Sequence, residues 1–242
     1  MELERFEKAF SKLTDLFSEQ GFYNNPNRFE IDVYGKIIDY ELQALIITER
    51  LEEDISNDKS HTKYVFGSLE EGKDINDDEM KKDILNHVKL NLDLSDFYIY
   101  TRLFLDALTV GIKRSFLYTG NKYKCMIGDS VSCLLNSNMQ TYKEQIDPVF
   151  FGNLEKKLAW IKDFREARIG LVHKYHHFVF TTTRQGELGY DIMDREKVEW
   201  GTDTVKSISA EVQTVINNLC ELLEYLYDCL PGKDTKNIKM EL

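Results

Sequence analysis

The chain has 242 residues and a formal net charge of −11 at pH 7. Its 42% hydrophobic and 30% charged residues are typical of a globular protein and exclude a disordered or collagen-like one. The acidic balance argues against broad electrostatic attraction to nucleic acid or anionic membranes, so any polyanion must bind at a local basic patch.

The pattern of apolar residues and cysteines indicates a cellular location. No stretch approaches the roughly 18–20 uninterrupted apolar residues of a membrane span. Residues 1–20 alternate charged with apolar side chains, unlike a secretory signal, and the 4 cysteines form no Cys-x2-Cys pair. We therefore expect a cytoplasmic protein with reduced thiols and no membrane segment.

The first 82 residues predict two helices and a polar insertion. Apolar residues recur every three or four positions from Leu3 to Phe17, which predicts an amphipathic helix ending near Gly21. A longer helix is predicted over 31–55 by the same spacing. Residues 56–82 are polar and acidic, and we expect a flexible insertion there.

The next predicted helix runs to about Tyr118 and is apolar around most of its circumference, which is typical of the central helix of a bundle. Asp93 or Ser95 is expected to cap its start. Arg102 and Asp106 stand four residues apart within it and are expected to form an internal ion pair.

The second half of the chain predicts a helix over 154–175, capped by Asn153, and a β-hairpin over 177–192 around a Gln-Gly turn. The last long helix is predicted to open at Thr202, and residues 233–242 to form a flexible tail. The expected fold class is all-α: one domain over 1–242, an antiparallel bundle of about five long helices with a small β-hairpin inserted before the last helix.

The segment between Leu154 and Tyr175 carries the residues most suggestive of chemistry. It holds six basic residues and three acidic ones, a local net charge of +3 in an acidic chain. Arg168 and His173 stand five residues apart within it, and Tyr175 follows. Histidine transfers protons near neutral pH, and the planar guanidinium of arginine presents several donors to a phosphate.

This Arg-x4-His-x-Tyr pattern resembles the signature of the HEPN superfamily of helical bundles, especially the toxin half of HEPN/MNT toxin–antitoxin pairs. The resemblance covers residues 90–230 loosely and the motif closely. It implies a homodimeric, metal-independent endoribonuclease, a toxin or defence effector, with Arg168 and His173 as catalytic residues. It also implies regulation by an antitoxin through modification of Tyr175, while Lys162 and Arg165 would guide RNA.

Two other interpretations stay open. Ile169 stands where many family members carry a polar residue, and the acidic charge and the hairpin also favour a catalytically inactive HEPN-like module that binds a protein partner or a nucleotide. His173, His176 and His177 have a spacing that suits metal ligands on one helix, but a strand starting at His177 would break that geometry. We therefore expect no metal and no cofactor.

On a straight helix, residues five apart point about 140° away from each other. Arg168 and His173 are therefore expected to meet at one phosphate in one of three ways. The arginine reaches around the helix, the helix ends near Gly170, or a second subunit contributes.

Overall fold

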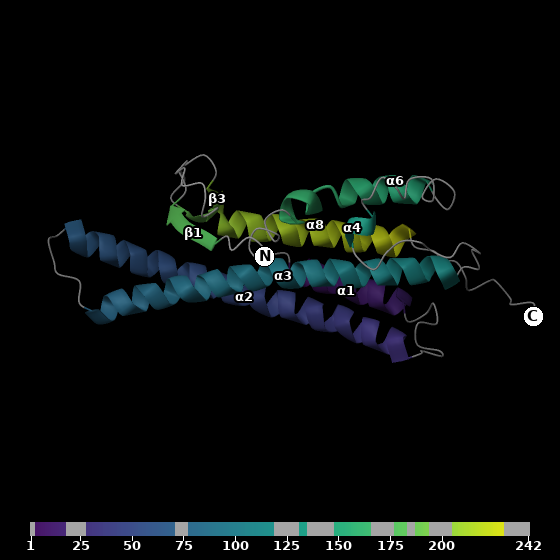
Figure 1. The fold of residues 1–242 in the computed structure, drawn as a ribbon, viewed down its shortest axis with the longest axis horizontal. Helices are drawn as coiled ribbons and strands as arrows, with labels where there is room; N and C mark the ends of the chain where they lie inside the picture. The colour runs from purple at the N-terminus through teal and green to yellow at the C-terminus, as the bar shows by residue number, and fades with distance from the viewer. Residues whose placement is uncertain are drawn as a thin grey trace, which may run out of the picture. The chain divides into compact units, whose positions relative to one another are not determined.

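The computed structural model describes residues 3–17, 28–70, 77–118, 131–134, 148–165, 177–182, 187–193 and 205–229. The helices and strands follow one another along the chain as coloured in Figure 1: α1 (Leu3–Phe17), α2 (Arg28–Glu70), α3 (Asp77–Tyr118), α4 (Val131–Leu134), α6 (Pro148–Lys157), β1 (His177–Thr182), β2 (Leu188–Met193), β3 (Lys206–Ser207) and α8 (Ile208–Cys229). The predicted fold class is confirmed, because helices dominate and a small antiparallel sheet precedes the last helix. None of the described helices has the length and hydrophobicity that crossing a membrane requires.

Contacts divide the chain into two compact units. The first unit comprises residues 1–42, 101–162 and 215–242, and the second comprises residues 43–100 and 163–214. Each unit has its own buried apolar side chains.

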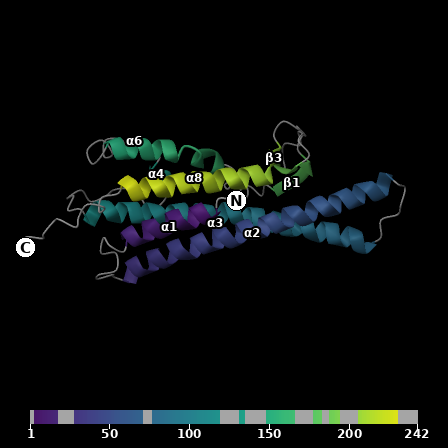
Figure 2. The same cartoon turned by 180° about the vertical axis from the view of Figure 1, so that it is seen from behind.

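The first unit is held together by aromatic packing. Phe6 of α1 meets Phe104 of α3 edge to face with ring centroids 6.0 Å apart, and Phe10 lies 5.9 Å from the same ring. Figure 2 shows α1 running alongside α3 as these contacts require. Tyr225 of α8 stacks on Phe150 of α6 and donates a 2.8 Å hydrogen bond to the Phe150 carbonyl oxygen. The expected amphipathic helix over residues 3–17 is therefore confirmed, with its apolar face against α3.

The predicted ion pair between Arg102 and Asp106 is confirmed. The Nε atom of Arg102 lies 3.1 Å from a carboxylate oxygen of Asp106. Arg102 also donates to the hydroxyl of Ser132 at 2.8 Å, and the Val131 amide donates to Asp106 at 2.8 Å. The pair therefore holds the short helix α4 against α3.

The second unit contains the sheet, whose strands have the order β1-β2-β3. β1 and β2 pair antiparallel, with Phe180 opposite Tyr190, so the predicted hairpin is confirmed. The third strand was not predicted. It spans only two residues, and its second residue, Ser207, also caps α8 by accepting a 3.3 Å hydrogen bond from the Ala210 amide.

The prediction of a flexible insertion over 56–82 is wrong for most of its length. α2 continues to Glu70 and α3 already begins at Asp77, while residues 71–76 lie outside the described part. Polar residues such as Glu and Lys have good helix propensity, so a polar run does not by itself end a helix. The carboxylates of Asp77, Asp78 and Glu79 in the first turn of α3 also complement its macrodipole.

The expected cap at Asp93 or Ser95 is also wrong, since both residues lie inside α3. The Ser95 hydroxyl donates to the carbonyl of Asn91 at 2.7 Å, the usual bond of a serine within a helix. The buried carboxylate of Asp93 pairs instead with Arg50 of α2.

Two further helix boundaries differ from the prediction. The helix expected over 154–175 begins at Pro148, because proline suits the first helical position, and a turn at 158–160 interrupts it before helical residues 161–165. The last helix begins at Ile208 instead of Thr202, because Lys206 and Ser207 extend the sheet. Residues 166–175, Thr202 and the tail over 233–242 lie outside the described residues.

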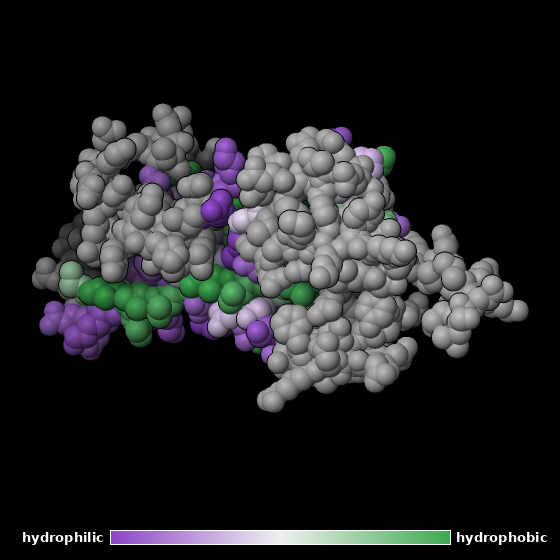
Figure 3. Space-filling model, turned by 45° about the vertical axis from the view of Figure 1, so that its right-hand side comes forward, coloured by the Kyte–Doolittle hydropathy of each residue, from purple (hydrophilic) through white to green (hydrophobic). Residues whose placement is uncertain are grey.

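An exposed apolar band runs along the first part of α3 in the second unit. Ile84, Leu85, Val88 and Leu92 are each half exposed or more, and their spacing places them along one side of the helix. Figure 3 shows hydrophobic side chains gathered along this helix beside hydrophilic ones. Phe178 and Phe180 of β1 join part of this band to line an apolar groove of about 550 Å³.

Candidate functional site

The structure describes two of the five candidate site residues. Lys162 and Arg165 lie in helical residues 161–165, and both side chains are exposed. Ile161 and Phe164 of the same stretch are buried, so an apolar side faces the protein while the basic side chains face solvent. Exposed cations of this kind are available to an RNA phosphate.

Arg168, His173 and Tyr175 lie outside the described residues. Their segment, residues 166–176, is bounded in the sequence by the end of the 161–165 helical stretch and by the start of β1 at His177. The described residues nearest to this segment are those of the 161–165 stretch and of β1.

An aromatic cluster centred on Tyr98 of α3 contacts both flanks. The ring of Tyr98 stacks on Phe164 with centroids 4.6 Å apart and an interplanar angle of 21°. The same ring lies 6.0 Å from Phe178, the second residue of β1. Phe178 in turn meets Tyr190 of β2 edge to face at 5.2 Å. One buried ring thus contacts the chain just before and just after residues 166–176.

The hydroxyl of Tyr98 is fixed by a buried hydrogen-bond chain. It donates to a carboxylate oxygen of Glu211 in α8 at 3.2 Å, and it lies 2.5 Å from the hydroxyl of Tyr190. Because a hydroxyl has one proton to donate, Tyr190 then donates to Tyr98. Lys206 lies 3.6 Å from the same Glu211 carboxylate and balances its charge.

Burial is the main reason that the pKa of Tyr98 lies well above its usual value, and the nearby Tyr190 and Glu211 raise this pKa further. The pKa of Tyr190 is raised first by burial and then by the charge of Glu211. Both phenols therefore stay protonated at neutral pH and can serve as hydrogen-bond donors.

Sequence reasoning missed this cluster. Tyr98 belongs to an almost wholly apolar stretch of helix, and Tyr190 to a β-prone run, where aromatic residues ordinarily indicate core packing. Because 92 residues separate the two tyrosines in the chain, no local spacing connects them. Their pairing depends on tertiary structure alone.

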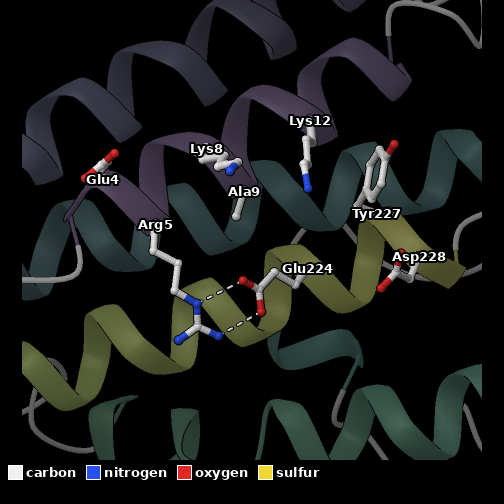
Figure 4. A pocket seen from close by; sticks show the side chains of 8 residues that line it. All are labelled: Glu4, Arg5, Lys8, Ala9, Lys12, Glu224, Tyr227 and Asp228. Carbon is white, nitrogen blue, oxygen red and sulfur yellow. Dashed lines mark hydrogen bonds and ion pairs between the residues drawn. The ribbon is translucent and has the colours of Figure 1, made fainter.

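A second concave site lies in the first unit, between α1 and α8. Figure 4 shows its lining residues around a cavity of about 460 Å³. Arg5 forms a bidentate pair with Glu224 at 2.9 and 2.8 Å, and the Lys12 ammonium lies 5.6 Å from the centroid of the Tyr227 ring. Hydrogen bonds from Arg5 hold the pKa of Glu224 below its usual value. Three cations and three carboxylates line this cavity, so it offers no net charge to an anionic ligand.

No group of three or more potential metal ligands occurs among the residues that the structure describes. His177 is the first residue of β1, and His173 and His176 lie outside the described residues. A helical three-histidine site that included His177 is therefore contradicted, because His177 is part of a strand.

No protein-family profile, curated protein sequence or solved structure matches this chain.

Proposed function

We propose that this chain is a HEPN-type, metal-independent endoribonuclease that acts as a toxin or defence effector. The observation that carries the proposal is the Arg168-x4-His173-x-Tyr175 motif directly after an exposed basic stretch that includes Lys162 and Arg165. The mostly helical fold with a late helix is compatible with the bundle that the resemblance implies.

The proposed reaction is an internal phosphoryl transfer. A base removes the proton of the ribose 2′-hydroxyl, and the resulting oxygen attacks the adjacent phosphorus. The bond to the 5′-oxygen breaks, an acid protonates this leaving oxygen, and a 2′,3′-cyclic phosphate remains. His173 supplies the proton-transfer chemistry, and Arg168 stabilises the charge that builds on the phosphoryl oxygens.

In this proposal two copies of the chain form a homodimer, so that each phosphate meets an Arg168 and a His173. Lys162 and Arg165 contact RNA phosphates outside the reacting centre. Modification of Tyr175 by an antitoxin partner would silence the enzyme by placing a bulky, charged group beside His173.

The decisive experiment measures cleavage of a mixed RNA panel in EDTA by wild type, His173→Ala and Arg168→Ala. We expect cyclic-phosphate products from wild type and a rate roughly 10²–10⁴-fold lower in each variant. His87→Ala is the matched control, because His87 lies on α3 beside the apolar groove and should leave the rate unchanged. Equal rates in wild type and both motif variants would refute the proposal, once intact mass has excluded a modified Tyr175.

The basic residues before the motif call for a separate test. Lys162→Ala and Arg165→Ala should raise KM several-fold and weaken the salt dependence of RNA binding, with little change in kcat. Lys81→Ala is the control, because Lys81 is an exposed lysine of α3 that approaches only Asp78 among the described residues, at 3.5 Å. An equal effect of Lys81→Ala would show that Lys162 and Arg165 act only through overall charge.

A second candidate function is a catalytically inactive module that binds a protein partner. The exposed apolar band on α3, with its adjoining groove, favours this alternative, because soluble proteins rarely expose contiguous apolar side chains without a binding role. Lack of RNA cleavage by unmodified wild type would favour it over the ribonuclease.

A further inference from the structure

The apolar groove of the second unit is lined by a helix and a strand. α3 contributes Ile84, Val88 and Leu92 to its lining, and β1 contributes Phe178 and Phe180. Ile84 and Leu92 are each 58% exposed and Val88 is 50% exposed, so about half of each side chain is in contact with water. Figure 3 shows the hydrophobic surface along this part of α3. Covering that surface with a partner is favourable, because apolar side chains would leave water.

The strand side of the groove is fixed by the protein core. Phe178 is 4% exposed, and its ring centroid lies 5.2 Å from that of Tyr190 and 6.0 Å from that of Tyr98. The ring of Phe180 meets the ring of His87 on α3 edge to face, with centroids 6.0 Å apart. These contacts hold β1 and α3 at a fixed separation. A groove that has its shape before binding reduces the cost of ordering when a partner binds.

The spacing of the exposed side chains on α3 suits a helical partner. Four apolar side chains that are half exposed or more stand four residues apart: Met80, Ile84, Val88 and Leu92. Side chains four apart form a continuous ridge along a helix, and such a ridge packs into the groove between two rows of side chains on another helix. The ridge from Met80 to Leu92 is roughly 18 Å long at 1.5 Å per residue. A partner helix of about four turns would match this length.

The charges beside the ridge favour an acidic partner. Residues 80–92 contain three lysines and one aspartate, a local net charge of +2 in a chain of −11. Lys81, Lys82 and Lys89 are all exposed. The acidic residues 77–79 precede the ridge, in the first turn of α3. The same surface of a second copy carries the same net charge of +2, so it matches the apolar side chains but not the charge.

We propose that the apolar groove and the ridge bind an amphipathic helix of a partner protein. The apolar stripe of that helix packs against Ile84, Val88 and Leu92, and its flanking Glu and Asp side chains face the lysines of α3. The inference does not depend on ribonuclease activity, because no residue of the Arg168-x4-His173-x-Tyr175 motif takes part. It gives the partner-binding alternative a defined surface and a defined class of partner.

Three labelled peptides of about 18 residues, or five helical turns, test the proposal with the full-length chain. The first two carry leucines at helical spacing, flanked by glutamates in one and by lysines in the other. Fluorescence anisotropy should show saturable binding of the glutamate peptide, at least about tenfold tighter than that of the lysine peptide, and added salt should reduce this difference. The third peptide has the composition of the glutamate peptide with its leucines at alternate positions, which prevents an apolar helical stripe.

The third peptide should bind at least about tenfold more weakly than the glutamate peptide, because only a helical stripe matches the ridge. Equal affinities for the glutamate peptide and either of the other two would overturn the proposal. So would the absence of binding by the glutamate peptide.

Val88→Gln and Ile46→Gln are a matched pair of variants. Both residues are β-branched and similarly exposed, at 50% and 53%, but Ile46 lies on α2 and does not line the groove. Val88→Gln should weaken binding of the glutamate peptide roughly tenfold, and Ile46→Gln should change it by less than about twofold. Both side chains are exposed, so circular dichroism should show that both variants fold. Equal weakening by the two variants would place the peptide elsewhere and contradict the proposal.

Lys82→Glu tests the charge of the partner. It should weaken binding of the glutamate peptide and strengthen binding of the lysine peptide, each roughly two- to fivefold, because Lys82 is an exposed charge at the edge of the site. Sedimentation of the three variants and wild type decides whether a second copy is the occupant instead. A dimer that Val88→Gln dissociates and Ile46→Gln preserves would mean that two copies bind through this surface, and the proposal of an acidic partner helix would be wrong.

Discussion

Glu41 is a carboxyl group in a place that disfavours its charge. It lies on α2 with 5% of its surface exposed, and Glu7 of α1 is close enough to repel its charge. Burial, and to a smaller degree Glu7, raise the pKa of Glu41 to about 7. The folded protein therefore keeps a proton at Glu41 that the unfolded chain releases above its ordinary pKa near 4.5.

This difference makes stability depend on pH in a defined direction. Between about pH 4.5 and 7 the native state binds more protons, so the free energy of unfolding falls as pH rises and reaches its lower plateau above pH 7. Glu41→Gln cannot ionise, and we expect it to be about 1–3 kcal/mol more stable than wild type at pH 8 and nearly equal at pH 4. Urea unfolding at several pH values measures this.

Glu7→Gln removes the charge of Glu7, which is the smaller of the two causes that raise the pKa of Glu41. It should therefore increase the free energy of unfolding at pH 8 by less than Glu41→Gln does. If Glu41→Gln and wild type showed the same dependence on pH, the raised pKa of Glu41 would be wrong.

At the residue scale, local spacing predicted local contacts and nothing beyond them. Arg102 and Asp106 lie one helical turn apart, so the sequence alone was enough to pair them. Tyr98 and Tyr190 meet only because the hairpin packs against α3, and no pattern in either segment indicates this contact. Lys162 and Arg165, which were predicted to guide RNA, are both exposed, and the predicted role itself stays a prediction.

At the scale of elements, α2 and α3 of the second unit are joined by a small charged cluster. Asp93 of α3 is 3% exposed and pairs with Arg50 of α2, and it also shares a hydrogen bond with Asp54. Burial comes first among the causes that raise the pKa of Asp54 to about 6, followed by the hydrogen bond and the charge of Asp93. Below this pH the protonated Asp54 carboxyl donates to the Asp93 carboxylate and links the two helices.

Asp93→Asn tests this link, because it removes a negative charge while keeping a polar group of similar size. We expect the pKa of Asp54 to fall towards its usual 3.8, as measured by NMR titration of the side-chain carboxyl carbon. Asp96→Asn is the control. The charge of Asp93 raises the pKa of Asp96, but Asp96 is not among the groups that shift the pKa of Asp54. An unchanged Asp54 pKa in Asp93→Asn would show that burial alone is responsible.

Element boundaries were harder to predict than element types, for reasons that these helices illustrate. The polar stretch after residue 55 resembled a loop, yet it continues α2, because polar residues such as Glu and Lys have good helix propensity. Asp93 and Ser95 are good capping residues in isolation. Inside α3 the first pairs with Arg50 and the second bonds to the preceding turn, which only the tertiary structure reveals.

At the scale of the whole molecule, the all-α class and the inserted hairpin were predictable because both depend on periodicity. The third strand, β3, could not be predicted, because a strand of two residues is too short to show an alternation of apolar and polar residues. The division of the contacts into two units could not be predicted from the sequence either. No run of Pro, Gly or Ser marks the four changes of unit. Those at residues 42–43, 100–101 and 214–215 fall inside α2, α3 and α8, and the one at 162–163 falls inside helical residues 161–165.

These three continuous helices lead to a prediction about cooperativity. Unfolding one unit alone would require ending α2, α3 and α8 in their interiors, where each new helix end leaves backbone groups without intrahelical partners. We therefore expect one unfolding transition, as a single domain over 1–242 implies. Calorimetry should give equal calorimetric and van't Hoff enthalpies.

Two variants make the test specific to each unit. Leu94→Ala lies in the second unit and Leu223→Ala in the first, and both leucines are fully buried. Each should cost about 2–5 kcal/mol and lower the same melting temperature by roughly 5–15 °C. Two transitions, each moved by only one variant, would instead mean that the units unfold independently. The contacts of Tyr98 would then depend on the stability of the second unit alone, because all of its partners lie there.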